Sequence, residues 1–262
     1  MSGRREQRHP IVQLRFQISD LLPLGDPISV PLLRLMAASN DVRHAMKQII
    51  RAQRGGRAPR NRAERAIRDG EQLYLVRMLC GHLEEARLAF RNLWLTQRTR
   101  RRLRSLMVVD AAGRAALDLL QREFVSEAAT GLHGRFLNPV RNQWAFHYLD
   151  QPYRQGLHRM AGERSVLLIA RAAGLSRYIV TDDFIRQAVL DASGGTRPAY
   201  EKAVSEAVAV GGALGSMVDR VLLGLLNRPK AQYSRRDTRL MLERALARGQ
   251  REAEARRTGR RE

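Results

Sequence analysis

Arg141, Asn142 and His147 form the pattern in this chain that best suits phosphate chemistry, within the stretch LNPVRNQWAFHYLD at residues 137–150. An arginine guanidinium can neutralise charge that develops on phosphoryl oxygens. A histidine, whose ordinary pKa is about 6.5, can take or give a proton at neutral pH. The two could therefore let an RNA 2′-hydroxyl attack the adjacent phosphate without a metal ion, and Asn142 would orient a side chain or the phosphate.

The spacing of this pair does not distinguish it from chance. Forty-four of the 47 basic residues are arginines, and the chain has six histidines. With these numbers, an arginine followed by a histidine after four to six intervening residues is expected about three times by chance, the usual weakness of short motifs. Three such pairs occur: Arg4–His9, Arg77–His82 and Arg141–His147.

The surroundings of Arg141 do distinguish it from the other two arginines. Asn138 and Pro139 predict the start of a helix directly before it, where free backbone N–H groups and the helix dipole favour a phosphate. The polar Asn142 follows Arg141, whereas Met78 follows Arg77. These features make Arg141 the arginine of interest.

The geometry of an ideal helix limits how Arg141 and His147 can meet. Six residues turn the chain through about 600°, so the two side chains lie about 120° apart and about 9 Å apart along the axis. They converge only if Arg141 reaches along the surface, if the helix bends, or if a second subunit completes the site. Phe146 and Tyr148 flank the histidine and could hold its ring.

Glu84 and Glu85, on the long helix expected before this stretch, could support the site by pairing with Arg141. Ordinary salt bridges are the alternative interpretation of both acids. Each site residue has a structural alternative as well. Arg141 would be a surface helix residue, His147 a capping or half-buried histidine, and Tyr148 a packing residue.

The composition favours helices packed on helices. Hydrophobic residues make up 44% of the chain and aromatic residues only 5%, and alanine, leucine and valine dominate the apolar set. The single cysteine, Cys80, excludes an internal disulfide framework and a cysteine-rich zinc site, and it is expected to be a small buried hydrophobe. The sequence contains no glycine-rich phosphate loop with lysine, no GxSxG and no HExxH, so no cofactor is expected.

The formal net charge of +21 predicts attraction to a polyanion, and RNA is the expected partner. A GC-rich genome that inflates arginine is the alternative explanation. The run RTRRRLR concentrates this charge in one place. Its arginines are either a contact for the phosphate backbone or a solvated helix end: Arg98, Arg100, Arg101, Arg102 and Arg104.

Hydrophobic periodicity predicts an all-α protein: an up-and-down helical bundle with additional C-terminal helices and basic termini. The strongest signal is a helix over 62–96, where apolar residues recur at alternating spacings of three and four. Further helices are expected over 31–53, 111–129, 181–192 and 198–226, and one beginning at 138. Residues 11–19 alternate as a strand does, or form an extended surface arm.

These elements give a provisional division of the chain. An N-terminal arm spans 1–30, a helical bundle 31–160, helices packed on that bundle 161–232, and a charged tail 233–262. The N-terminus lacks a signal-peptide pattern, and Asp219 and Arg220 interrupt the most apolar region. A cytoplasmic protein with no membrane partner is therefore expected.

The stretch VRNQWAFHY, preceded by the helix that carries YLVRMLCGHLEEA, resembles the HEPN family (higher eukaryotes and prokaryotes nucleotide-binding) over residues 60–160. The hallmark of that family is an arginine, a polar residue, a short gap and a histidine, which correspond here to Arg141, Asn142 and His147. The ending FHY and the upstream GHLEEA are similar to bacterial members whose activity is unassigned.

The resemblance implies an all-α bundle of four or five helices. It also implies a metal-independent ribonuclease of a toxin–antitoxin or phage-defence system, a homodimer in which two motifs face each other, and an antitoxin protein as a further partner. The hypothesis of another class is a noncatalytic helical module that binds RNA or a protein partner. Cleavage of RNA by the wild type, lost on His147→Ala in the absence of metal, would distinguish the two.

Overall fold

The computed structural model describes residues 18–54, 59–107, 110–125, 131–142, 154, 157–158 and 179–226. Within these ranges the chain is helical and has no strand, which confirms the all-α fold. The helices are α1 (Ile18–Leu21), α2 (Ser29–Arg54), α3 (Arg62–Leu95), α4 (Gln97–Leu106), α5 (Ala111–Leu120), α6 (Asn138–Val140), α8 (Ile179–Ala192) and α9 (Arg197–Leu226). Two π-helical turns, η1 (Gln121–Val125) and η2 (His133–Leu137), complete the set.

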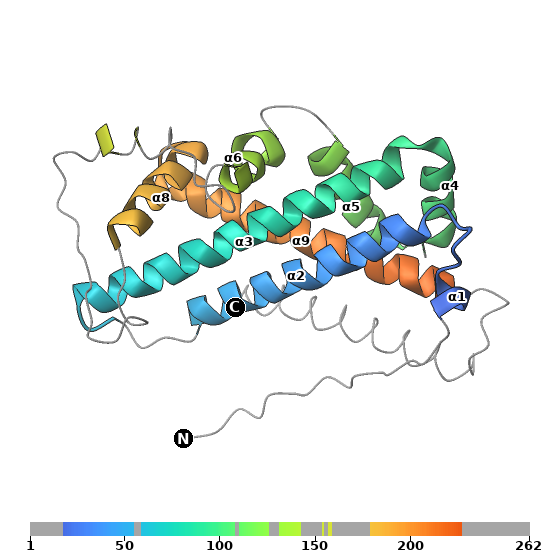
Figure 1. Ribbon diagram of the computed structural model, residues 1–262, viewed down its shortest axis with the longest axis horizontal. Helices are drawn as coiled ribbons and strands as arrows, with labels where there is room; N and C mark the ends of the chain where they lie inside the picture. The colour runs from blue at the N-terminus through green and yellow to red at the C-terminus, as the bar shows by residue number, and fades with distance from the viewer. Residues whose placement is uncertain are drawn as a thin grey trace, which may run out of the picture.

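Three long helices dominate the molecule. α2 and α3 lie side by side and run in opposite directions, and α9 lies behind them (Figure 1). α5 and α4 pack on α9, and η1, η2, α6 and α8 pack on α3. The structure therefore makes α3 the helix against which most of the shorter elements are placed.

The sequence determines where α3 begins. The side chain of Asn61 accepts a hydrogen bond from the backbone N–H of Glu64 (2.8 Å), and the Glu64 carboxylate accepts one from the N–H of Arg60 (2.8 Å). The first bond satisfies a backbone donor that a helix start leaves free, and the second ties the residue before the cap to the first turn. α3 continues for 34 residues to Leu95 and is the longest helix described, as the 62–96 pattern predicts.

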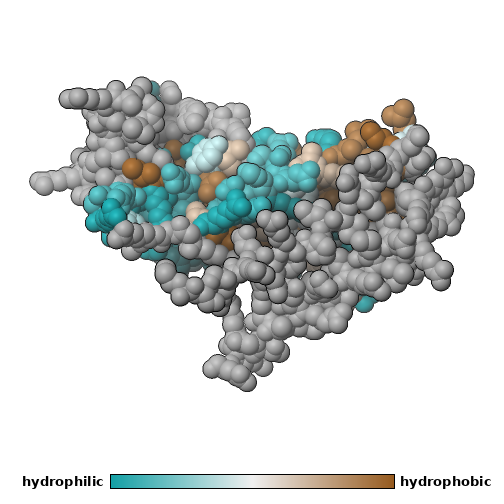
Figure 2. Space-filling model, turned by 90° about the horizontal axis from the view of Figure 1, so that it is seen from below, coloured by the Kyte–Doolittle hydropathy of each residue, from teal (hydrophilic) through white to brown (hydrophobic). Residues whose placement is uncertain are grey.

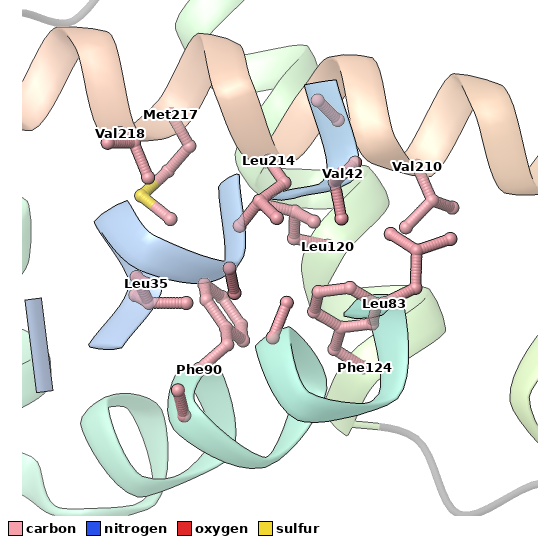
Figure 3. Packing of buried hydrophobic residues seen from close by; sticks show 14 of the residues in the cluster. Leu35, Val42, Leu83, Phe90, Leu120, Phe124, Val210, Leu214, Met217 and Val218 are labelled. Carbon is pink, nitrogen blue, oxygen red and sulfur yellow. The ribbon is translucent and has the colours of Figure 1, made fainter. Parts of the chain in front are cut away.

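The apolar seam of α3 faces the centre of the protein. Leu83 and Phe90 on α3 meet Leu35 and Val42 on α2, and Leu214 enters from α9 (Figure 3). The Phe90 ring stacks on Trp94 and meets Phe124 of η1 edge-on. Residues before 160 and residues of α9 thus share one hydrophobic cluster, so they have no separate cores.

α9 is a long, strongly apolar helix of the core. An 18-residue window in it has a mean hydropathy of 1.5, so by length and composition alone it could cross a membrane. In this structure 56% of that window is buried inside the protein. Gly224 lies so close to the carbonyl of Leu106 that there is no room for a side chain, and this contact joins the end of α9 to the end of α4.

Two local predictions differ from the structure at the residues that it describes. Ile18, the last apolar residue of the expected strand or arm over 11–19, begins α1; residues 11–17 lie outside the described ranges. The expected helix start at Asn138 is absent, because Leu132, Leu137 and Asn138 all have right-handed helical backbone angles and one helical segment runs through them. The Asn138 N–H bonds to the His133 carbonyl in the wider π pattern, directly before Pro139, which has no N–H to donate.

Candidate functional site

Arg141 lies on the face of the η2–α6 segment that packs against α3. Its Nη2 donates to Oε1 of Glu85 at 2.8 Å, and its Nη1 donates to Oδ1 of Asn142 at 2.9 Å. The Nε atom is enclosed and has no hydrogen-bond partner. The Arg141 side chain is 29% exposed and that of Glu85 is 49% exposed, so solvent reaches this pair.

Asn142 positions Arg141 rather than meeting α3 itself. Its Nδ2 donates to Oδ1 of Asn138 at 2.5 Å, while its own oxygen accepts from Arg141. The chain of contacts therefore runs from Asn138 through Asn142 and Arg141 to Glu85. Because helical backbone precedes Arg141 and its N–H bonds to the Asn138 carbonyl, the free N–H groups expected at a helix start are not available here.

Glu84 does not join this pair, although it is the neighbour of Glu85 in sequence. Its carboxylate accepts two hydrogen bonds from Nε of Arg87 (2.9 Å) and one from Nη2 (2.6 Å). Its Oε2 also lies 2.9 Å from Nδ1 of His133. All three side chains are largely enclosed, with exposures of 5% for Glu84, 8% for Arg87 and 19% for His133.

The Glu84–Arg87–His133 cluster fixes the orientation of the histidine. A carboxylate bound to a guanidinium is purely an acceptor, so Nδ1 of His133 donates a hydrogen bond to Glu84. An imidazole held in this way resembles the carboxylate-oriented bases of hydrolytic sites in its geometry. His133 and Arg141 are eight residues apart, about 12 Å along an ideal helix, and they contact adjacent residues of α3, Glu84 and Glu85.

Sequence reasoning missed this second cluster. The spacing of three residues between Glu84 and Arg87 is typical of an ion pair on a helix, and the sequence alone contains this signal. The sequence does not point to His133, because the nearby Gly131 and Gly134 predict that helical structure is interrupted there. The structure instead places Gly134 inside η2.

Comparisons with known proteins add nothing to this geometry. No protein-family model matches the chain, and neither the curated proteins nor the solved structures contain a match.

Two residues of the predicted site, His147 and Tyr148, lie outside the described residues. The catalytic role assigned to His147 therefore stays a prediction. Among the residues that the structure does describe, no group of three or more His, Cys, Asp or Glu side chains could hold a metal ion.

The arginine-rich run forms α4, a helix with one buried and one basic side. Thr99, Leu103 and Leu106 are buried. Arg100 and Arg104 lie over the Trp94 ring, with 5.9 Å and 5.0 Å between the guanidinium carbon and the ring centroid, a cation–π arrangement.

The other arginines of α4 line an open hollow of about 760 Å³ beside Asp26. Arg102 donates to the Asp26 carboxylate from Nε (3.1 Å) and Nη2 (3.0 Å), so its charge is largely neutralised. Arg98 and Arg101 line the same hollow and are exposed. Two of the five arginines expected to contact nucleic acid are thus presented to solvent beside a concave surface.

The end of the molecule that carries α1 and α4 also exposes aliphatic side chains. Figure 2 shows hydrophobic surface gathered toward the right-hand end, where α1 lies in Figure 1, beside a largely hydrophilic face. The exposed aliphatic residues of α1, the loop that follows it and the start of α2 are Ile18, Leu24, Val30 and Leu33.

Cys80 and His82 have structural roles. Cys80 is fully buried, and burial raises the pKa of its thiol far above the ordinary value, which makes it an unreactive core residue, as expected. Nδ1 of His82 lies 3.7 Å from Oδ2 of Asp41 on α2, so this histidine links α2 to α3 across the surface.

Proposed function

We propose that the chain is an RNA-binding protein of HEPN type and a metal-independent ribonuclease, with Arg141, Asn142 and His147 as its catalytic residues. The observation that carries the proposal is the position of Arg141. It is held by Glu85 and Asn142, stays partly exposed, and keeps one buried guanidinium nitrogen without a partner. An all-α bundle built around a long helix is also the architecture that the family resemblance implies.

To act on the RNA, Arg141 would exchange the Glu85 carboxylate for a phosphate group of the RNA. Glu85 is half-exposed, so the ion pair costs little to open, and a phosphate can replace the carboxylate. Asn142 keeps the guanidinium in place during this exchange. His147 would supply the proton transfer, and a second copy of the chain would bring a matching motif to the same RNA.

The decisive experiment measures cleavage of bulk RNA by the purified full chain in excess chelator. Wild type is expected to cleave, and Arg141→Ala and His147→Ala are each expected to lower the rate by at least about 100-fold, the usual size of an acid–base or charge-stabilising contribution. His44→Ala and Arg197→Ala are matched controls, because both residues are exposed and lie on other helices. Cleavage retained in both site variants would refute the assignment.

The second candidate function is a noncatalytic module that binds RNA. The observation that favours it is the neutralisation of Arg141 by Glu85, together with the exposed Arg98 and Arg101 on α4. In this case wild type binds RNA without cleaving it, Arg98→Ala/Arg101→Ala weakens binding, and affinity falls steeply with salt. A wild type that cleaves RNA with a rate dependent on His147 would exclude this candidate.

A further inference from the structure

Arg77 is a largely buried arginine with an unsatisfied nitrogen. The residue is 9% exposed, and its Nε is enclosed with no hydrogen-bond partner. An arginine side chain stays protonated in proteins, so it carries a full charge here. A polar nitrogen enclosed without an acceptor is unfavourable, and an anion bound to the guanidinium from outside the chain would offset part of that cost.

Arg77 lines a pocket that could admit such an anion. The pocket has a volume of about 630 Å³ and lies between α2, α3 and the first turn of α8. Its volume is within the range of small-molecule sites in proteins. The lining residues that bear on a ligand are Gln48, Arg51, Glu71, Tyr74, Arg77 and Asp182.

The charges around the pocket favour a phosphate group. Arg51 on α2 is exposed and gives a second guanidinium on the helix facing Arg77. Two guanidinium groups on opposite helices can grip the several oxygens of one phosphate. Two acids, Glu71 and Asp182, also line the pocket, and Asp182 already has an interaction. Glu71 is exposed and would oppose an anion, so it is expected to limit affinity.

Tyr74 adds a planar surface to the same pocket. It lies three residues before Arg77, so both side chains are on one face of α3, and it is 54% exposed. An exposed tyrosine ring can stack on a planar ring of a ligand. We propose that this pocket binds a small phosphate monoester that carries a planar ring, with Arg77 anchoring the phosphate and Tyr74 packing on the ring.

This inference does not depend on the ribonuclease proposal, because it uses none of the residues near Arg141. The test measures the affinity of the full chain for phenyl phosphate and for inorganic phosphate by calorimetry in a chloride buffer. Wild type is expected to bind phenyl phosphate at least about fivefold more tightly than inorganic phosphate, since stacking adds to charge. Absence of binding at millimolar phenyl phosphate would overturn the proposal.

Variants separate the contributions of the pocket. Arg77→Met keeps the side-chain volume and is expected to weaken phenyl phosphate binding at least tenfold. Tyr74→Leu should remove the preference for phenyl phosphate over inorganic phosphate, and Glu71→Gln should strengthen the binding of both. The control is Arg65→Met, which removes an exposed arginine of α3 outside the pocket and should leave both affinities unchanged.

Two further results complete the test. If Arg77→Met binds phenyl phosphate as wild type does, Arg77 is an uncompensated charge with no ligand and the proposal is wrong. If Arg77→Met does not fold, Arg51→Met serves instead and is expected to weaken binding about fivefold. A short RNA with a 5′-phosphate, compared with its 5′-hydroxyl form, then shows whether the phosphate comes from a small molecule or from an RNA end.

Discussion

Arg77 and Arg87 lie ten residues apart on the same helix and are nearly equally buried, but their surroundings differ completely. Arg87 places its guanidinium on both oxygens of Glu84, and His133 approaches the same carboxylate. Arg77 has no such partner and lines an open pocket. The burial of an arginine therefore does not by itself reveal its role. Arg87 is part of the ion-paired packing of α3, whereas Arg77 lies at a pocket where an anion could bind.

Arg220 on α9 shows that the paired arrangement is not peculiar to α3. It is 6% exposed and donates to both oxygens of Asp110, at 2.9 Å each. Its Nη1 also bonds to the carbonyl of Ser216 at 3.2 Å. Arg87 and Arg220 thus follow the usual rule that buried charges are paired, and Arg77 is the exception to be explained.

The largest effect is expected where the paired arginine loses its partner. Glu84→Ala leaves Arg87 and His133 enclosed without a carboxylate, so the free energy of unfolding should fall by about 3–5 kcal/mol. Chemical denaturation of wild type and variant measures this difference. Glu85→Ala is the matched control, since its pair with Arg141 is half-exposed and should contribute less than about 1 kcal/mol. Equal losses in the two variants would contradict the distinction.

A smaller effect of opposite sign is expected at Arg77. Without ligand, Arg77→Met should raise the free energy of unfolding by about 1 kcal/mol or more, because it removes a buried charge and keeps most of the volume. Arg87→Met should lower it, because Glu84 loses the guanidinium that neutralises it. Denaturation in a phosphate-free buffer compares the two variants. A loss of stability in Arg77→Met would show that Arg77 has a partner in solution.

The smallest effect concerns pH. Hydrogen bonds from Arg220 hold the pKa of Asp110 below its ordinary value of 3.8, so the ionised carboxylate stabilises the fold above that pH. This stabilisation is lost as the pH falls through the lowered pKa. Asp110→Asn keeps an oxygen for the cap on Gly113, and it removes the charge together with one of the two acceptors for Arg220. The stability difference between wild type and Asp110→Asn should be constant above about pH 5 and narrow below pH 3.8; a constant difference at all pH values would contradict this account.

The fold was largely predictable from the sequence, because long helices carry their signal in many residues. The seam through Leu79, Leu83 and Phe90 and the capping pair Asn61 and Glu64 agree on one helix. The bounds of α3 and α9 accordingly lie within a residue or two of the prediction.

The candidate site was less predictable from the sequence. It depends on which residues of α3 face the η2–α6 segment, which lies more than 45 residues further along the chain. The sequence offers Glu84 and Glu85 alike as possible partners of Arg141, and only Glu85 contacts it. Glu84 contacts His133 instead, because adjacent residues on a helix point about 100° apart. No local pattern distinguishes Arg77 from the many other arginines; its burial together with its unsatisfied Nε, both properties of the folded chain, does.

The π-helical turn at His133–Leu137 has a consequence for how the site could have arisen. A π turn holds one more residue than an α turn, so it amounts to a one-residue insertion absorbed within a helix. In a continuous α-helix an extra residue would rotate everything after it by about 100°, and the wider π turn takes up that rotation locally. Deleting one residue there should leave an ordinary α turn, with Arg141 still facing Glu85 and His133 still against Glu84. The two polar clusters are therefore expected to keep their places on α3 through such a deletion.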